Sequence, residues 1–172
     1  MTVPGIAETR QYLTFKLGEE VFGVDVAKVR EILEITTITK VPQTPPFMRG
    51  VINLRGSVVP VVDMRLKFGM PPSERTVNTC IVVVEVALDG EPTVLGALVD
   101  SVQEVFELEP DQIEPAPRIG TKLRTEFLLG MGKRDERFLL LLDIDMVFRL
   151  EELAMILDAG GAGPAADRAA AV

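Results

Sequence analysis

Three aspartates are the residues of this chain whose spacing most resembles a chemical site. Asp143 and Asp145 lie two positions apart in Leu-Asp-Ile-Asp, directly after an apolar run, and Asp63 follows a similar Val-rich run. Carboxylates that share one strand face can bind a divalent cation such as Ca²⁺. Each aspartate also stands where a strand should end and a helix begin, and Asp is a favoured N-cap residue. The sequence leaves both readings open and favours helix capping over a metal site.

Composition excludes several other kinds of chemistry. The 172 residues include no histidine, which removes Ser-His-Asp and Cys-His catalysis and histidine-ligated zinc. Cys80, the one cysteine, lies in a Val/Ile run and is interpreted as a small buried hydrophobe. The segment Gly130-Met-Gly-Lys133 is not a phosphate loop, because Phe127 stands where such a loop needs its first glycine. We therefore expect no enzyme, no cofactor and no metal.

A binding residue is better indicated than a catalytic one. Arg55 lies in the corner Asn53-Leu54-Arg55-Gly56, between two β-branched runs. Asn and Gly supply the backbone conformations of a tight turn, and Pro60 marks a sheet edge or a bulge because it cannot donate to a ladder. The planar fork of Arg55 could bind carboxylates or carbonyls of a partner. A solvated turn arginine is the alternative reading.

The aspartates and Arg55 must be positioned by strands and turns. A composition with 47% hydrophobic residues, 12 Pro and 14 Gly predicts a β-rich fold. Residues 11–17 alternate and predict a half-buried strand, followed by a turn and a return strand at 21–24. Val26, Val29, Ile32 and Leu33 recur at helical spacing and predict a short amphipathic helix, capped by Asp25. Further elements are a loop at 70–78, strands at 79–87 and 92–99 around an Asp-Gly turn, a strand or helix at 102–108, a buried strand at 137–143 and an amphipathic C-terminal helix at 146–157.

The chain also repeats itself weakly. At an offset of 73 residues, Val21-Phe22-Gly23 falls on Val94-Leu95-Gly96 and Val29 falls on Val102. At an offset of 80, with one insertion, Phe47, Gly50 and Asp63 fall on Phe127, Gly130 and Asp143. Such a pattern predicts two copies of one module of about five strands, each a small barrel, with a groove between them as the default binding site. The second copy lacks the Arg55 corner, which suggests that this corner holds a site.

Charge and hydropathy limit the partners. The formal net charge of −8 disfavours nucleic acid and anionic membrane surfaces. There is no apolar run of 18 residues and no basic, apolar leader at the N-terminus, so we expect no membrane insertion and a cytoplasmic location. Residues 1–9 are expected to form a flexible N-terminus, and the Ala/Gly-rich residues 158–172 a disordered tail.

Four segments in constant order resemble the CheW family, the adaptor proteins of bacterial chemotaxis: Phe22–Asp25, Thr44–Phe47, Gly50–Asp63 and Val99–Val102. The resemblance covers residues 10–157 and implies a mainly β fold of two intertwined five-stranded SH3-like barrels with a few short helices and a C-terminal helix.

The same resemblance implies a non-catalytic cytoplasmic adaptor that couples methyl-accepting chemoreceptors to the histidine kinase CheA. Its partners would be the cytoplasmic tip of the receptor and the regulatory domain of CheA. A CheW-like module for another motility or two-component kinase pathway is the nearest alternative, and a carboxylate- or metal-dependent enzyme is a remote one. The implied receptor-binding groove falls on Val29, Gly50, Asn53, Arg55 and Val102.

Overall fold

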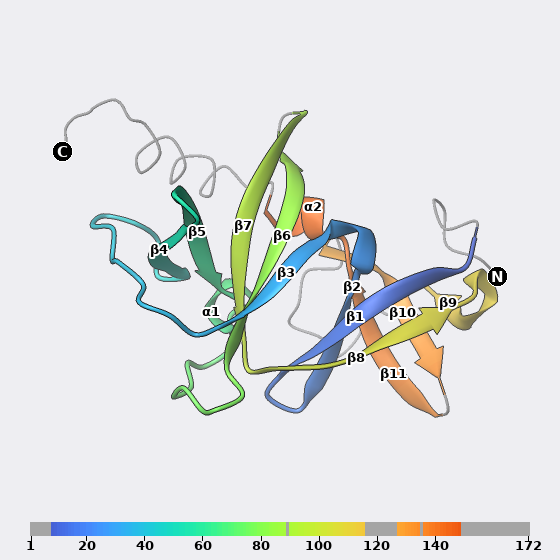
Figure 1. Ribbon diagram of the computed structural model, residues 1–172. Helices are drawn as coiled ribbons and strands as arrows, with labels where there is room; N and C mark the ends of the chain where they lie inside the picture. The colour runs from blue at the N-terminus through green and yellow to red at the C-terminus, as the bar shows by residue number, and fades with distance from the viewer. Residues whose placement is uncertain (1–7, 89, 116–126, 135, 149–172) are drawn as a thin grey trace.

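The computed structural model describes residues 8–88, 90–115, 127–134 and 136–148, and most of this described part is strand. Its strands form two sheets, which Figure 1 shows on opposite sides of the view. The first sheet has the order β8-β1-β2-β11-β10-β9 and contains β1 (Arg10–Leu17), β2 (Glu20–Asp25), β8 (Ser101–Leu108), β9 (Ile113–Glu114), β10 (Leu128–Arg134) and β11 (Arg137–Leu142). The second has the order β3-β6-β7-β5-β4 and contains β3 (Val29–Glu34), β4 (Met48–Leu54), β5 (Ser57–Asp63), β6 (Cys80–Leu88) and β7 (Glu91–Val99). Short helices link them: η1 (Val26–Lys28), α1 (Met64–Lys67), η2 (Pro110–Gln112) and α2 (Ile144–Val147). The mainly β prediction is confirmed.

The two sheets repeat one arrangement. Let the first half run from β1 to α1 and the second half from β6 to α2. The order β8-β1-β2-β11-β10 of the first sheet then matches β3-β6-β7-β5-β4 of the second, strand for strand. Each sheet takes its leading hairpin, β1–β2 or β6–β7, from one half and its remaining matched strands from the other. The halves are therefore intertwined, as the resemblance implied.

Equivalent contacts recur at the predicted offsets. The parallel ladder between β5 and β7 pairs Val61 with Gly96, and that between β11 and β2 pairs Leu141 with Gly23. The Asp63 amide donates to the Phe47 carbonyl at 2.7 Å, and the Asp143 amide donates to the Phe127 carbonyl at 2.8 Å. The ladders among described residues do not join β8 to β9 or β3 to β4, so closure of each sheet into a barrel stays a prediction.

The core has a central part and one part within each sheet. A large apolar cluster lies between the sheets and takes side chains from both, while Tyr12, Phe106, Leu108, Ile113, Leu139 and Leu141 form a cluster within the first sheet. Strand β1 contributes to both clusters, with Tyr12 to the first-sheet cluster and Phe15 to the central one. Its prediction as a half-buried strand is wrong, because Tyr12 and Thr14 are also buried. Both faces of β1 are covered, one by side chains of its own sheet and one by the central cluster between the sheets.

The predicted amphipathic helix over Val26–Leu33 is also wrong. Only η1 is helical there, and from Val29 the chain continues as edge strand β3, paired antiparallel with β6. β-Branched residues suit a strand, and the ladder to β6 satisfies the backbone groups that a helix would have used. The Asp25 cap is confirmed, since its side chain accepts a hydrogen bond from the Ala27 amide at 2.9 Å. The equivalent segment of the second half is strand β8.

Several local predictions are confirmed. Strands β6 and β7 form a hairpin in which Leu88 pairs with Glu91, and residues 70–78 contain no helix or strand. Pairing of β5 with β7 begins only at Val61, so Pro60 lies where β5 has a free edge on that side. None of the helices within the described ranges is long and apolar enough to span a bilayer. Most of the predicted C-terminal helix at 146–157 and of the N-terminal segment 1–9, and all of the tail at 158–172, lie outside the described residues.

Candidate functional site

The corner that carries Arg55 is a two-residue hairpin turn between β4 and β5. Leu54 pairs with Ser57, and both intervening residues have left-handed backbones, with φ of +51° at Arg55 and +88° at Gly56. The Asn53 side-chain oxygen accepts a hydrogen bond from the Gly56 amide at 2.8 Å. Such turns fit the twist of a hairpin and favour Asn or Gly at both central positions. An arginine held in this conformation is unusual, and it points to a requirement for the side chain.

Arg55 forms an ion pair with Glu31 of the edge strand β3. Its Nη2 donates to Glu31 Oε2, and its Nη1 lies 3.4 Å from Oε1. The Arg55 side chain is 71% exposed and that of Glu31 is 27% exposed. The hydrogen bond from Arg55 to Glu31 and the charge of Glu31 raise the pKa of Arg55. The pair holds the guanidinium beside β3 while most of it remains accessible to a partner.

A cleft of about 590 Å³ lies beside this ion pair, on the second sheet. Glu31 and Arg55 line it together with Arg30, which is paired with Glu85 at 2.8 Å. The apolar side chains that line it come from β4, β5, β6, β7 and the loop before β4: Val41, Met48, Val51, Leu54, Val58, Val59, Pro60, Val83, Pro92 and Val94. An apolar surface with charged groups beside it suits recognition of another protein.

The other predicted site residues take different places. Val29 lies opposite Val84 on β6, and Val102 lies opposite Phe15 on β1, in equivalent registers of the two sheets. Both are half-buried, and both pack against the central cluster. The structure thus brings them to the same core, one from each sheet.

Gly50 and Asn53 are placed by the corner strand β4. Asn53 is exposed at the turn, next to Arg55. Gly50 is buried, with φ of +143°, and a Cβ there would lie 2.1 Å from the Thr39 carbonyl oxygen. That close approach permits two hydrogen bonds of 2.8 Å between Thr39 and Val51. Gly50 therefore shapes the backbone, and of the five predicted residues only Arg55 lines the cleft.

The three aspartates act as caps and ion-pair partners. The Asp63 and Asp143 side chains accept hydrogen bonds of 3.3 Å from the Leu66 and Met146 amides, capping α1 and α2. Asp145 pairs with Lys28 at 2.9 Å. Capping is confirmed for Asp63 and Asp143 but not for Asp145. No group of His, Cys, Asp or Glu in the described part of the chain is arranged to hold a metal ion.

Cys80, interpreted above as a buried hydrophobe, is only half-buried. It packs against the central cluster. Burial raises the pKa of its thiol, against the opposing effect of a backbone hydrogen bond with Val102.

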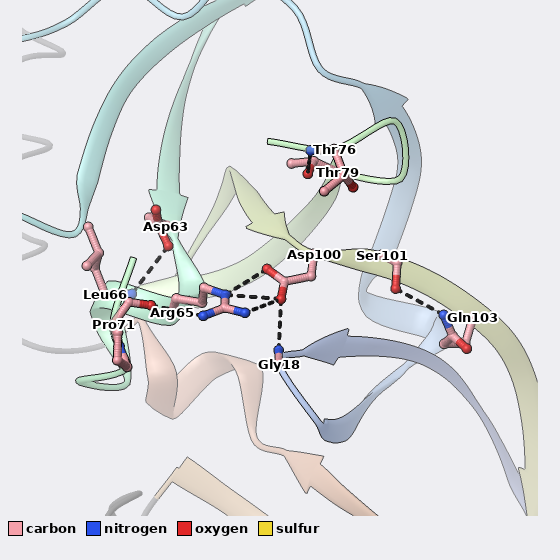
Figure 2. Close-up of polar contacts among 10 residues, drawn as sticks. All are labelled: Gly18, Asp63, Arg65, Leu66, Pro71, Thr76, Thr79, Asp100, Ser101 and Gln103. Carbon is pink, nitrogen blue, oxygen red and sulfur yellow. Dashed lines mark hydrogen bonds and ion pairs between the residues drawn. The ribbon is translucent and has the colours of Figure 1, made fainter. Parts of the chain in front are cut away.

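Sequence reasoning missed the ion pair between Arg65 and Asp100, shown in Figure 2. Arg65 Nε lies 2.9 and 3.0 Å from the two Asp100 oxygens, and its Nη2 lies 2.6 Å from Oδ2. The Gly18 amide donates to the same carboxylate at 2.8 Å, and Arg65 Nη1 donates to the Pro71 carbonyl at 2.9 Å. This clamp ties α1, at the end of the second sheet, to the β1–β2 turn of the first.

The clamp fixes the protonation state of Asp100. Burial alone raises the pKa of Asp100, but the hydrogen bonds from Arg65 and Gly18 and the Arg65 charge outweigh it and lower the pKa. The Arg65 pKa is raised, mainly by its hydrogen bond to Asp100. The carboxylate is thereby kept ionised.

A second clamp repeats the first with its charges reversed. Asp145, which the repeat alignment places on Arg65, pairs with Lys28 and accepts a hydrogen bond of 2.9 Å from the Ala87 amide. Lys28 directly precedes Val29, and Asp100 stands two residues before Val102. Each clamp therefore anchors the start of one edge strand, β3 or β8. Neither pair could be found from the sequence, because the partners lie 35 and 117 residues apart.

Comparisons of the sequence and the fold with those of known proteins identify the family of this chain. Residues 11–152 match the family model described as a CheW-like domain. The chain is 40% identical over 147 residues to the chemotaxis protein CheW of Klebsiella aerogenes, covering 86% of each chain. It is 36% identical over 143 residues to that of Rhizobium meliloti, covering 83% of this chain and 90% of the relative. Among solved structures, it resembles the scaffolding protein TtCheW from Thermoanaerobacter tengcongensis with a TM-score of 0.74 and 33% identity, covering 83% of this chain and 94% of that one.

Proposed function

Because this chain belongs to the CheW family, we propose that it is a non-catalytic cytoplasmic adaptor that couples chemoreceptors to the histidine kinase CheA. One side would bind the cytoplasmic tip of a methyl-accepting receptor, and another would bind the regulatory domain of CheA. The observation that carries the proposal is Arg55, which is held in a left-handed turn and paired with Glu31 beside an apolar cleft.

The edge strand β3 connects the proposed receptor contacts. Val29 opens β3, and Glu31, which holds Arg55, follows two residues later. Two residues of strand span about 6.6 Å, well within the footprint of one helix. A receptor helix lying along β3 would contact Val29 through its apolar stripe, and Arg55 would bind a carboxylate or carbonyl and fix the register. Val102, at the equivalent position of β8, would be a further receptor contact on the first sheet.

Four exposed apolar side chains offer further docking surface, and the two on the first sheet support a kinase surface separate from the Arg55 cleft. Ile32, Val58, Val105 and Phe138 are between 45% and 64% exposed. They form two equivalent pairs, because Ile32 falls on Val105 at the offset of 73 and Val58 on Phe138 at the offset of 80. The same two positions are thus exposed on each half. Ile32 and Val58 belong to the second sheet, where β3 and the Arg55 cleft are proposed for the receptor. Val105 and Phe138 lie on β8 and β11 of the first sheet, outside the lining of that cleft, and exposed apolar positions there suit docking of the kinase regulatory domain.

The test is binding of the purified chain to a receptor cytoplasmic fragment and, separately, to the CheA regulatory domain. Arg55→Ala should weaken receptor binding about tenfold or more, leaving kinase binding and the melting temperature unchanged. Lys133→Ala is the control, since Lys133 is also exposed and ion-paired, with Glu114, but lies outside this cleft and outside β3. It should change receptor binding less than twofold.

Phe138→Ser tests the second surface and should weaken kinase binding while sparing the receptor. If the wild-type chain binds neither partner, chemotaxis coupling is refuted and a different kinase pathway becomes the better assignment. If Arg55→Ala binds the receptor as the wild type does, the corner is not the receptor site.

A further inference from the structure

A second cleft, of about 440 Å³, is lined by three cationic side chains from three segments. Lys40 comes from the loop before β4, Arg49 from β4 itself, and Arg75 from the loop between α1 and β6. Pro45, Pro46 and Met48 contribute apolar surface. None of the described residues that line this cleft is acidic.

The cations of this cleft are largely unneutralised. Within the described part of the chain, the side chains of Lys40 and Arg75 have no ion-pair or hydrogen-bond partner. Arg49 lies 3.5 Å from Asp63, whose other oxygen caps α1. The chain as a whole carries 26 acidic and 18 basic residues. A concave site lined by three cations therefore creates a local positive potential on an acidic protein.

The duplicated scaffold does not require this charge. The position equivalent to Arg49 at the offset of 80 is Leu129, which packs against the first-sheet cluster. The position equivalent to Lys40 at the offset of 73 is Ile113, which is fully buried. The second half thus uses core residues where the first half exposes cations, so the cationic cleft is a feature added to one half.

The walls of the cleft are ordered by short-range contacts. The Thr44 hydroxyl donates to the Val41 carbonyl at 3.0 Å, and the Met48 amide donates to the Pro45 carbonyl at 2.9 Å. The Thr39–Val51 bridge fixes the entry of the loop. A preformed wall lowers the entropy that a ligand must offset on binding.

We propose that this cleft binds a short acidic segment of a partner protein. Carboxylates of the segment would pair with Lys40, Arg49 and Arg75, and one apolar side chain would pack against Pro45, Pro46 and Met48. A net charge of −8 repels long polyanions and anionic membranes from the molecule as a whole. A short peptide escapes most of that repulsion because it meets only the local potential. Met48 and Val41 line both clefts, so this site adjoins the Arg55 cleft without sharing its charged residues.

The probe is a fluorescently labelled peptide of six glutamates around one leucine, titrated with the full chain at about 0.1 M salt, where the Debye length is about 10 Å, and followed by anisotropy. Lys40→Gln/Arg75→Gln should weaken binding about tenfold, from the loss of two partly exposed charge contacts. Lys133→Gln/Arg137→Gln removes the same charge from the β10–β11 hairpin and should change binding less than twofold. A peptide with glutamines in place of the glutamates should not bind.

Equal weakening by both double variants would show only general electrostatic attraction and would overturn the proposal, as would binding of the glutamine peptide. Amide chemical shifts of the wild-type chain supply a test that depends on no variant. The acidic peptide should change the amide chemical shifts of Lys40, Gln43 and Arg75. A titration that leaves all three chemical shifts unchanged would also overturn the proposal.

Discussion

Removal of the Asp100 carboxylate should destabilise the whole fold, because this group joins the two sheets. The Asp100 carboxylate accepts hydrogen bonds from Nε and Nη2 of Arg65 and from the Gly18 amide. The Arg65 and Asp100 side chains are only 17% and 28% exposed. Buried hydrogen bonds to charged groups contribute about 1.5–3 kcal/mol each, whereas exposed ion pairs contribute about 0–1 kcal/mol. The clamp lies between these limits. We expect Asp100→Ala to lower the free energy of unfolding by about 2 kcal/mol.

The assay is urea denaturation followed by circular dichroism, with a double-mutant cycle on Arg65→Met and Asp100→Ala. The cycle should give a coupling energy of about 1–2 kcal/mol. The thermal midpoint of Asp100→Ala should fall by about 4–8 °C for a chain of this size. Glu114→Ala is the control, because it breaks the Lys133–Glu114 pair, which is 3.6 Å long with both side chains half exposed. That change should cost less than about 0.5 kcal/mol.

A cost for Asp100→Ala no larger than that of the control would refute the argument that this clamp holds the sheets together. A normal cost with a coupling near zero would show that the Gly18 hydrogen bond, and not the Arg65 pair, provides the stability. Either result would remove the proposed link between the clamp and the placement of Val102 at the start of β8.

Three further predictions concern pH, the buried glycine and a buried hydroxyl. Because the pKa of Asp100 is lowered in the folded state, the stability that its carboxylate provides is complete above the ordinary carboxyl pKa of about 3.9 and is lost as the pH falls through the lower folded-state pKa. The difference in unfolding free energy between wild type and Asp100→Asn should be constant from pH 7 to about 5 and shrink below about pH 4. A difference that grows in acid would contradict this sign. Gly50→Ala should lower the free energy of unfolding by about 3 kcal/mol or more, because the new Cβ would lie 2.1 Å from the Thr39 carbonyl oxygen. The destabilised variant should bind both partners more weakly, whereas loss of receptor binding alone at full stability would mean that Gly50 contacts the receptor directly. Thr14→Val should lower the free energy of unfolding by about 1–3 kcal/mol, since the fully buried hydroxyl donates to the Glu104 carbonyl at 2.6 Å and accepts from the Glu104 amide at 3.0 Å. Hydrogen exchange of the Glu104 amide should accelerate in this variant, and unchanged protection would argue against the hydrogen bond from that amide to Thr14.

Features that depend on neighbouring residues could be predicted from the sequence. The Asn53–Gly56 corner, the β6–β7 hairpin and the caps at Asp25, Asp63 and Asp143 all form between groups two to four residues apart. Turn and cap preferences act over that range, so local residue types determine them. The offsets of 73 and 80 were likewise visible, because a duplicated module repeats its apolar spacing and its caps.

Features that depend on the intertwining of the halves could not be predicted. Val26–Leu33 has helical spacing, yet the exposed edge of β6 makes Val29–Glu34 a strand. Tyr12 and Thr14 lie on the strand face that looks solvent-facing in sequence, but both are buried, and Tyr12 packs against side chains of β8, β9 and β11 in the same sheet. The general lesson is that hydrophobic spacing over a few residues does not decide between a helix and a strand when a neighbouring strand can complete the ladder.

The sequence by itself determined the family, the mainly β architecture and the duplication, because these follow from local motifs and their order, and it predicted a binding role for the Arg55 corner. The tertiary structure alone decided what Arg55 pairs with, how the sheets are clamped and where the cations gather. Glu31 lies 24 residues from Arg55, Asp100 lies 35 from Arg65, and Asp145 lies 117 from Lys28. The last two pairs each join one half of the chain to the other, and the first joins β3 to the β4–β5 turn of the same sheet. Turn, cap and spacing preferences act over a few residues, so no local pattern along the chain specifies contacts at these separations.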